Sequence, residues 1–122
     1  LARALRAMTA TVRSRCDSPA AKASLTVLVT NGETLVAGQG GKELYLSTHK
    51  TRCSDRGACK SLSPECEAPT LVGHVNHCII SSEPLQGENV WAPLDPGDIV
   101  GVDVGMHLYR SSPERHPLPV VA

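Results

Sequence analysis

The chain has 122 residues with twelve basic and twelve acidic side chains, so its formal net charge is zero and its length suits one small domain or part of a larger one. A balanced charge argues against a protein whose main ligand is the phosphate backbone of nucleic acid, because such proteins carry a basic excess. No apolar run approaches the roughly 18–20 residues that cross a bilayer, and Arg3 and Arg6 interrupt the stretch where a secretory signal would be apolar. These features predict a cytoplasmic protein with neither nucleic acid nor membrane as partner. Because the first residue is Leu1, we expect a processed chain or a fragment.

The first predicted element is a helix over residues 1–16. Apolar side chains recur along it at three- and four-residue spacing, with arginines between them: Leu1, Leu5, Met8 and Val12. Asp17 favours a turn, and the ring of Pro19 opposes continuation of the helix.

A β-hairpin is predicted next. Residues 25–30 are rich in β-branched side chains and alternate only in part, which is typical of a strand covered on both faces. Asn31 and Gly32 separate this strand from a second one at residues 33–37. An Asn-Gly pair between two such runs favours a type I′ turn, which needs positive φ at both positions.

The remaining elements are expected to be strands joined by turns and loops. They are residues 43–47, residues 71–82 as one strand or a pair, residues 99–104 and, after a turn at Gly105, residues 106–109. The glycine-rich segment 38–41 is expected to be a flexible joint and not a phosphate loop, because a strand follows it where a phosphate loop needs a helix. One helix followed by mostly antiparallel strands makes the fold class α+β.

Residues 50–69 form a polar, irregular segment that contains three of the five cysteines. The gaps between these cysteines are longer than the two to four residues typical of paired zinc ligands. A loop of reduced cysteines is therefore the preferred interpretation, and a loop disulfide is a second one. The alternative is a zinc site whose four ligands would be His49, Cys53, Cys59 and Cys66.

Four further residues are candidates for chemistry. His74 and His77 would point to opposite faces of a strand, which makes a shared metal ion difficult. Cys78 lies in an apolar strand, where a buried structural thiol is the usual role. Glu83 ends a hydrophobic strand, a common place for binding groups, although it could equally cap backbone amides around Pro84. The single tryptophan, Trp91, is expected to anchor its own loop to the sheet.

Several segments follow one another in an order that resembles a known family. A strand, an Asn-Gly turn and a return strand lead to Leu-Tyr-Leu-Ser at 44–47. The later segments are Ser-Glu-Pro-Leu at 82–85 at the end of a strand, Glu-Asn-Val-Trp at 88–91, Leu-Asp-Pro-Gly at 94–97 and Ile-Val-Gly-Val-Asp at 99–103. Across residues 20–104 this set is similar to the second half of the glutaminase domain of class II glutamine amidotransferases, in particular their small stand-alone members.

The resemblance implies an N-terminal-nucleophile hydrolase fold, in which two antiparallel sheets lie between helical layers. It also implies glutamine as substrate and no cofactor: an N-terminal cysteine thiolate attacks the side-chain amide, the α-amine of that cysteine acts as base, and ammonia passes to an acceptor. The family's nucleophile, glutamine-binding arginine and oxyanion Asn-Gly pair all precede the matched part, so the pair at 31–32 is a turn. Only Ser82 and Glu83 fall on a family motif, as groups that support the substrate pocket from behind.

Three functions are therefore open. In the first, residues 1–110 are the C-terminal half of a glutaminase domain, residues 111–122 are a flexible tail, and the catalytic half lies upstream or on a partner chain; this chain alone would be inactive. In the second, the chain is a non-catalytic binding or scaffold module of the same fold. In the third, it is an unrelated small zinc-binding β-rich protein. The first predicts that the isolated segment exposes a large apolar face, since half a sandwich cannot close its core.

Overall fold

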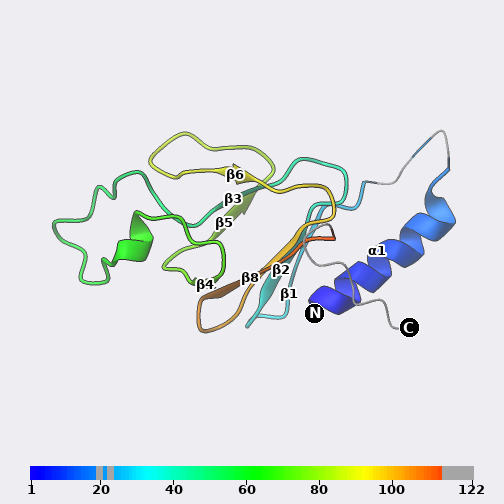
Figure 1. Ribbon diagram of the computed structural model, residues 1–122, viewed down its shortest axis with the longest axis horizontal. Helices are drawn as coiled ribbons and strands as arrows, with labels where there is room; N and C mark the ends of the chain where they lie inside the picture. Colours follow the sequence, from blue (N-terminus) through cyan, green and yellow to red (C-terminus); the bar gives the residue numbers. More distant parts are fainter. Residues whose placement is uncertain (19–20, 22–23, 114–122) are drawn as a thin grey trace.

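The structure is a computed structural model and describes residues 1–18, 21 and 24–113. One helix precedes the strands in the order the sequence predicts (Figure 1). The elements are α1 Ala2–Cys16, β1 Val27–Thr30, β2 Leu35–Gly38, β3 Tyr45–Ser47, the 3₁₀ turn η1 Pro64–Cys66, β4 Gly73–His74, β5 Ile79–Ser81, β6 Ala92–Pro93, β7 Ile99–Val102 and β8 His107–Ser111. No helix among the described residues is long and apolar enough to cross a membrane.

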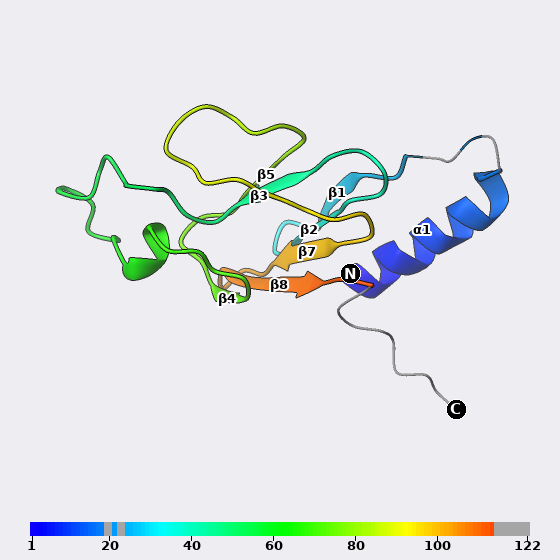
Figure 2. The same ribbon diagram turned by 45° about the horizontal axis from the view of Figure 1, so that its top comes forward.

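The strands form two sheets. One has five strands in the order β1-β2-β7-β8-β4, and the other has three in the order β5-β3-β6. Every pair of neighbouring strands is antiparallel. The α+β class with one helix and mostly antiparallel strands is thus confirmed. Figure 2 shows the two sheets as layers, with α1 reaching out beyond the end of the strands.

The main core lies between the two sheets. It consists of Ala37, Leu44, Leu46, Val75, Leu94, Val100, Val102 and Leu108, all buried. Because side chains alternate along a strand, Val36 and Ile99 point to the opposite face of the five-stranded sheet, where they pack against Leu5 of α1. Leu5 is the only buried residue of that helix. The helix therefore covers the outer face of the larger sheet through a single turn.

The hairpin is confirmed, but its turn is not of type I′. Thr30 pairs with Leu35, so the connection has four residues instead of two. Gly32 has a φ of +93°, whereas Asn31 has no positive φ. The Asn31 side-chain oxygen instead accepts hydrogen bonds from the backbone N–H of Glu33 and of Thr34, at 3.0 and 2.9 Å. This Asx-type arrangement replaces the mirror-image turn.

Strand β1 is not covered on both faces, contrary to the sequence-based expectation. It is the edge of the five-stranded sheet, and the side chains of Leu28 and Val29 are 51% and 37% exposed. Its β-branched composition reflects strand propensity here and not double burial.

Of the two alternatives predicted for residues 71–82, the structure has the pair of strands, and the two strands belong to different sheets. β4 pairs with β8 in the larger sheet, whereas β5 pairs with β3 in the smaller one. Val75, between them, is fully buried in the core, and Cys78 packs against the same core. The chain crosses from one layer to the other at this point.

Residues 111–113 are the described part of the expected tail. Ser111 is the last residue of β8, and Ser112 is buried. The rest of the expected tail, residues 114–122, lies outside the described residues.

Candidate functional site

Ser82 and Glu83 lie immediately after β5, where the chain leaves the three-stranded sheet. Both residues are exposed. The backbone N–H of Glu83 donates to the Ser81 hydroxyl at 3.3 Å. In the part of the chain that the structure describes, neither side chain forms a hydrogen bond or ion pair, so Glu83 does not cap the Pro84 turn. Its carboxylate is available to a ligand or to another chain.

Trp91 holds the loop that carries Ser82 and Glu83. Its indole Nε1 donates to the carbonyl of Leu85 at 3.0 Å. The next two residues form β6, which pairs with β3 at the edge of the smaller sheet. The tryptophan thus ties the far side of the loop back to the sheet, as the sequence indicates.

The cysteine-rich segment lies against the same loop. The Thr51 N–H donates to the Glu88 carbonyl at 2.9 Å, and the Val90 N–H donates to the His49 carbonyl at 3.0 Å. Lys50 Nζ lies 3.7 Å from a Glu88 carboxylate oxygen. A cavity of about 390 Å³ opens between the two segments. The segment at residues 50–69 therefore packs against the later part of this loop, at residues 87–90, and the lining of the cavity does not include Ser82 or Glu83.

The expected zinc ligands are not brought together. No three His, Cys, Asp or Glu side chains within the described ranges are placed to share a metal ion, so His49, Cys53, Cys59 and Cys66 do not form a ligand set. All five cysteines are free thiols, so the loop disulfide is not formed either. The backbone N–H of Cys53 donates instead to Glu67 at 2.7 Å. Carboxylates and amides of the chain itself organise this loop.

The surroundings of two thiols shift their pKa values in opposite directions. The hydrogen bond from Asn76 Nδ2 to the sulfur, at 2.9 Å, lowers the pKa of the Cys66 thiol, and the backbone of Ser63 adds to this effect. Burial raises the pKa of the Cys78 thiol to about 11. The interpretation of Cys78 as a structural thiol agrees with its position against the core.

These surroundings predict selective alkylation. At pH 8, iodoacetamide is expected to modify Cys66 more than ~100-fold faster than Cys78, because only the thiolate reacts and burial keeps Cys78 protonated. Peptide mass spectrometry of a time course measures both rates in one sample. Asn76→Ala should slow the reaction at Cys66 and leave Cys78 unchanged. Equal rates at the two thiols would contradict the prediction.

His74 and His77 lie in separate environments, as expected. His74 is exposed on β4, with its ring centroid 6.3 Å from that of His107. His77 precedes β5, and its Nε2 atom is buried without a hydrogen-bond partner. Burial, followed by the charge of Lys50, lowers the pKa of His77, so this imidazole is neutral at pH 7.

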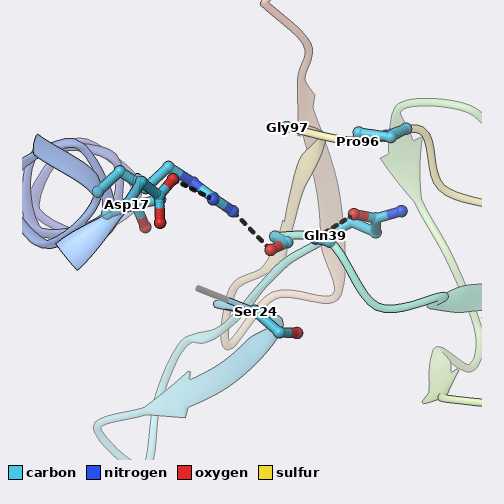
Figure 3. Close-up of a pocket in the computed structure, with 9 residues that line it drawn as sticks. Asp17, Ser24, Gln39, Pro96 and Gly97 are labelled. Atoms are coloured by element: carbon cyan, nitrogen blue, oxygen red, sulfur yellow. Dashed lines mark hydrogen bonds and ion pairs between the residues drawn. The ribbon is translucent and has the colours of Figure 1, made fainter. Parts of the chain in front are cut away.

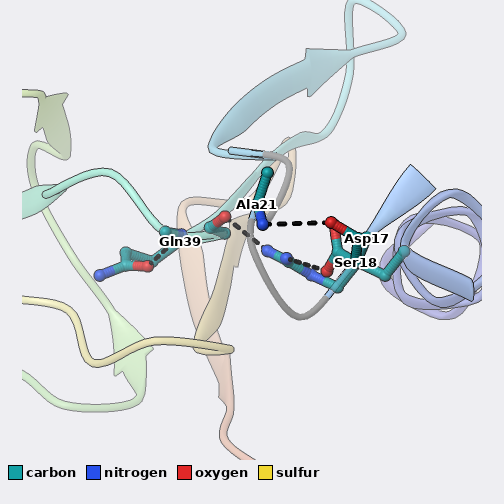
Figure 4. A network of polar contacts seen from close by, with 7 residues as sticks. Asp17, Ser18, Ala21 and Gln39 are labelled. Carbon is teal, nitrogen blue, oxygen red and sulfur yellow. Dashed lines mark hydrogen bonds and ion pairs between the residues drawn. The ribbon is translucent and has the colours of Figure 1, made fainter.

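A cavity of about 580 Å³ at the C-terminal end of α1 was not predicted from the sequence (Figure 3). Its lining residues are Thr9, Arg13, Asp17, Ser24, Gln39, Gly40, Gly41, Pro96 and Gly97. The Arg13 guanidinium donates to Asp17 at 3.1 Å and also to the Gly40 carbonyl. The side-chain oxygen of Gln39 accepts the N–H of Gly41 at 2.8 Å (Figure 4). The spacing of four residues between Arg13 and Asp17 is the one sequence signal for this cavity.

Among the described residues that line this cavity, no nucleophile is paired with a base. Its charged groups bind one another and the backbone, which is the arrangement of a structural junction between helix and sheet. The segment at residues 38–41, expected to be a flexible joint, is closely packed there: Gly97 N–H donates to the Gln39 carbonyl at 2.8 Å, and Leu25 N–H to the Gly40 carbonyl at 2.9 Å. The exposed strand end at Ser82 and Glu83 remains the candidate functional site. Comparisons of the chain with protein-family models, with curated proteins and with solved structures found no match.

Proposed function

We propose that this chain is the C-terminal half of the glutaminase domain of a class II glutamine amidotransferase, and that Ser82 and Glu83 support its glutamine pocket. The observation that carries the proposal is the Ser-Glu-Pro-Leu segment at the end of β5. Its serine and glutamate side chains are exposed and unpaired within the described residues, and Trp91 holds the loop at Leu85. A strand end held in this way can present a carboxylate to a substrate bound in a neighbouring half.

The layering supports the proposal. Two antiparallel sheets pack face to face, and α1 lies on the outer face of the larger one. In the proposed domain, these would be three consecutive layers of an αββα sandwich. The outer face of the smaller sheet carries no helix within the described residues. An upstream half would supply that layer in the proposed domain.

The apolar surface supports it as well. Besides Leu28 and Val29 on the edge strand, Leu71 and Val72 before β4 are 67% and 65% exposed, and Val104 is 80% exposed. Half of a sandwich is expected to leave such side chains open, because the other half would cover them. Single exposed aliphatic side chains also occur on complete domains, so this observation agrees with the proposal without distinguishing it from the scaffold module.

The proposed reaction places the covalent chemistry outside this chain. In the family that the sequence resembles, the thiolate of an N-terminal cysteine attacks the glutamine amide, and ammonia leaves with a proton from the α-ammonium group of the same cysteine; water then releases glutamate from the thioester. The carboxylate of Glu83 and the hydroxyl of Ser82 would support the glutamine pocket from behind and would take no part in the covalent steps. The acceptor of the ammonia would bind elsewhere.

The test uses the complete native polypeptide that carries residues 1–122. Its N-terminal sequence and intact mass are expected to show a segment upstream that starts at a free cysteine, and the protein is expected to release glutamate from glutamine. Glu83→Gln should lower kcat/KM by about tenfold. The matched control is Glu33→Gln in the exposed hairpin loop, which should leave kcat/KM unchanged.

Two outcomes would contradict the proposal. If the polypeptide begins at another residue and releases no glutamate alone or with a partner chain, the catalytic reading is wrong and the scaffold module is favoured. If glutamate is released but Glu83→Gln matches Glu33→Gln, the family is right and the role of Glu83 is wrong.

A further inference from the structure

His74 on β4 and His107 on β8 lie directly opposite each other on neighbouring antiparallel strands. The next pair along, Val75 and Met106, is joined by a hydrogen bond from the Val75 N–H to the Met106 carbonyl at 2.9 Å. Since bonded and non-bonded pairs alternate in an antiparallel ladder, His74 and His107 form a non-bonded pair, the type whose side chains lie closest. Their ring centroids are 6.3 Å apart. The ladder therefore fixes two imidazoles side by side on one face of the sheet.

One of these imidazoles is oriented by a carboxylate. Asp103 Oδ1 lies 3.3 Å from His107 Nδ1 and accepts the backbone N–H of His107 at 3.0 Å. Its other oxygen accepts the Tyr109 hydroxyl at 3.1 Å. A carboxylate on Nδ1–H leaves the Nε2 lone pair of His107 for a ligand.

The surrounding charge favours a cation. The Asp103 carboxylate lies beside His107 Nδ1, and Glu65 of η1 lies close enough to His74 to interact with it electrostatically. Neither histidine ring contacts the buried core, since both residues are exposed. The ring centroids are 6.3 Å apart, which is wider than for two imidazoles on one tetrahedral ion, so the two exposed side chains must turn to bring one nitrogen each to about 2.0–2.1 Å from a shared metal.

We propose that His74 and His107 bind a divalent transition-metal ion, with Zn²⁺ as the physiological candidate and Asp103 as the group that positions His107. Imidazole nitrogens are ligands for zinc, copper, nickel and cobalt but not for magnesium or calcium. No three metal-binding side chains converge in the described residues, so in the proposed site this part of the chain contributes two ligands and water completes the coordination. The site lies in the five-stranded sheet, apart from Ser82 and Glu83, and does not rest on the proposed glutaminase function.

The test is a titration of the complete polypeptide with Co²⁺ under reducing conditions, followed by displacement with Zn²⁺. One equivalent is expected to bind with the absorption of an oxygen and nitrogen environment and without thiolate-to-cobalt charge transfer. His74→Gln and His107→Gln should each weaken binding by at least about tenfold, and Asp103→Asn by about 10–100-fold through loss of the positioning contact. The matched control is His49→Gln, which changes a histidine in the loop after β3 and should leave the affinity unchanged.

Circular dichroism of each variant shows whether it is folded, and His74→Gln serves as the least disruptive change because His74 is exposed and has no hydrogen bond to another side chain within the described ranges. Two results would overturn the proposal. A thiolate charge-transfer band would assign the metal to cysteines, and unchanged affinity in folded His74→Gln and His107→Gln would show that the pair binds none.

Discussion

Replacement of Gly40 by alanine is expected to destabilise the fold by about 3 kcal/mol. A Cβ atom at this position would lie 2.2 Å from the carbonyl oxygen of Leu25 and 2.3 Å from its carbon, which is far inside contact distance. The two backbones are held there by the hydrogen bond from Leu25 N–H to the Gly40 carbonyl at 2.9 Å. The obstacle is backbone and not a mobile side chain, so the two segments that flank β1 and β2 must separate to admit the methyl group.

Gly57→Ala is the matched control. Nothing lies within 4 Å of a Cβ built at Gly57, and its φ is not in the left-handed region, so its effect should stay within about 0.5 kcal/mol of zero. Urea unfolding of the two variants and the parent polypeptide measures the differences in free energy of unfolding. They follow from the shifts of the transition midpoints, provided that the dependence of this free energy on urea concentration is unchanged. A Gly40→Ala variant as stable as Gly57→Ala would show that the chain around Leu25 moves away from residue 40 at little cost.

Asp98→Asn is expected to lower the free energy of unfolding by about 3–5 kcal/mol at pH 7. The Asp98 side chain is fully buried, and its Oδ2 accepts hydrogen bonds from Arg110 Nη2 and from the Asp95 N–H, both at 3.0 Å. Arg110 is itself mostly buried, with 14% of its side chain exposed. The substitution leaves that guanidinium in the sheet without its counter-ion. The matched control is Asp55→Asn, at an exposed position, and its free energy of unfolding should differ little from that of the parent.

The same carboxylate makes stability depend on pH. Burial by itself would raise the pKa of Asp98, but the hydrogen bond from Arg110 and the Asp95 backbone together hold it below the ordinary value. A lowered pKa in the folded state gives stability that is present above the unfolded-state pKa of about 3.9 and is lost as pH falls further, through the folded-state pKa. We expect Asp98→Asn to remove this contribution to the loss of stability at acid pH. An unfolding free energy that falls below pH 4 as steeply in Asp98→Asn as in the parent would contradict the assignment.

The elements set by local sequence were predictable. The helix follows from its apolar spacing and ends before Pro19, and the hairpin follows from Asn31 and Gly32 between two strand-forming runs. The turn type was wrong because the Asn31 side chain satisfies two backbone amides itself, a choice that composition does not reveal. The sequence therefore predicts where the chain reverses better than it predicts the backbone angles of the turn.

The features that depend on distant partners were not predictable. Nothing near Val29 in the sequence shows that β1 is an edge strand. Its edge position depends on the pairing of β7 with the other side of β2, far along the chain. Arg110 and Asp98 are joined only because β7 and β8 pair. For the candidate site, the strand end at Glu83 was predicted and its lack of a protein partner was not, since whether a carboxylate caps a turn is decided by the three-dimensional course of the loop.

Trp91 has a practical consequence for the study of the candidate site. It is the only tryptophan of the 122 residues, beside two tyrosines and no phenylalanine. Its indole N–H is bonded to the loop that carries Ser82 and Glu83. Within these 122 residues, fluorescence excited at the red edge of the aromatic band comes from this one tryptophan. A change in its quantum yield or emission maximum therefore reports on a change in the loop at residues 82–91. The chain thus contains its own spectroscopic label at the place where ligand binding is proposed.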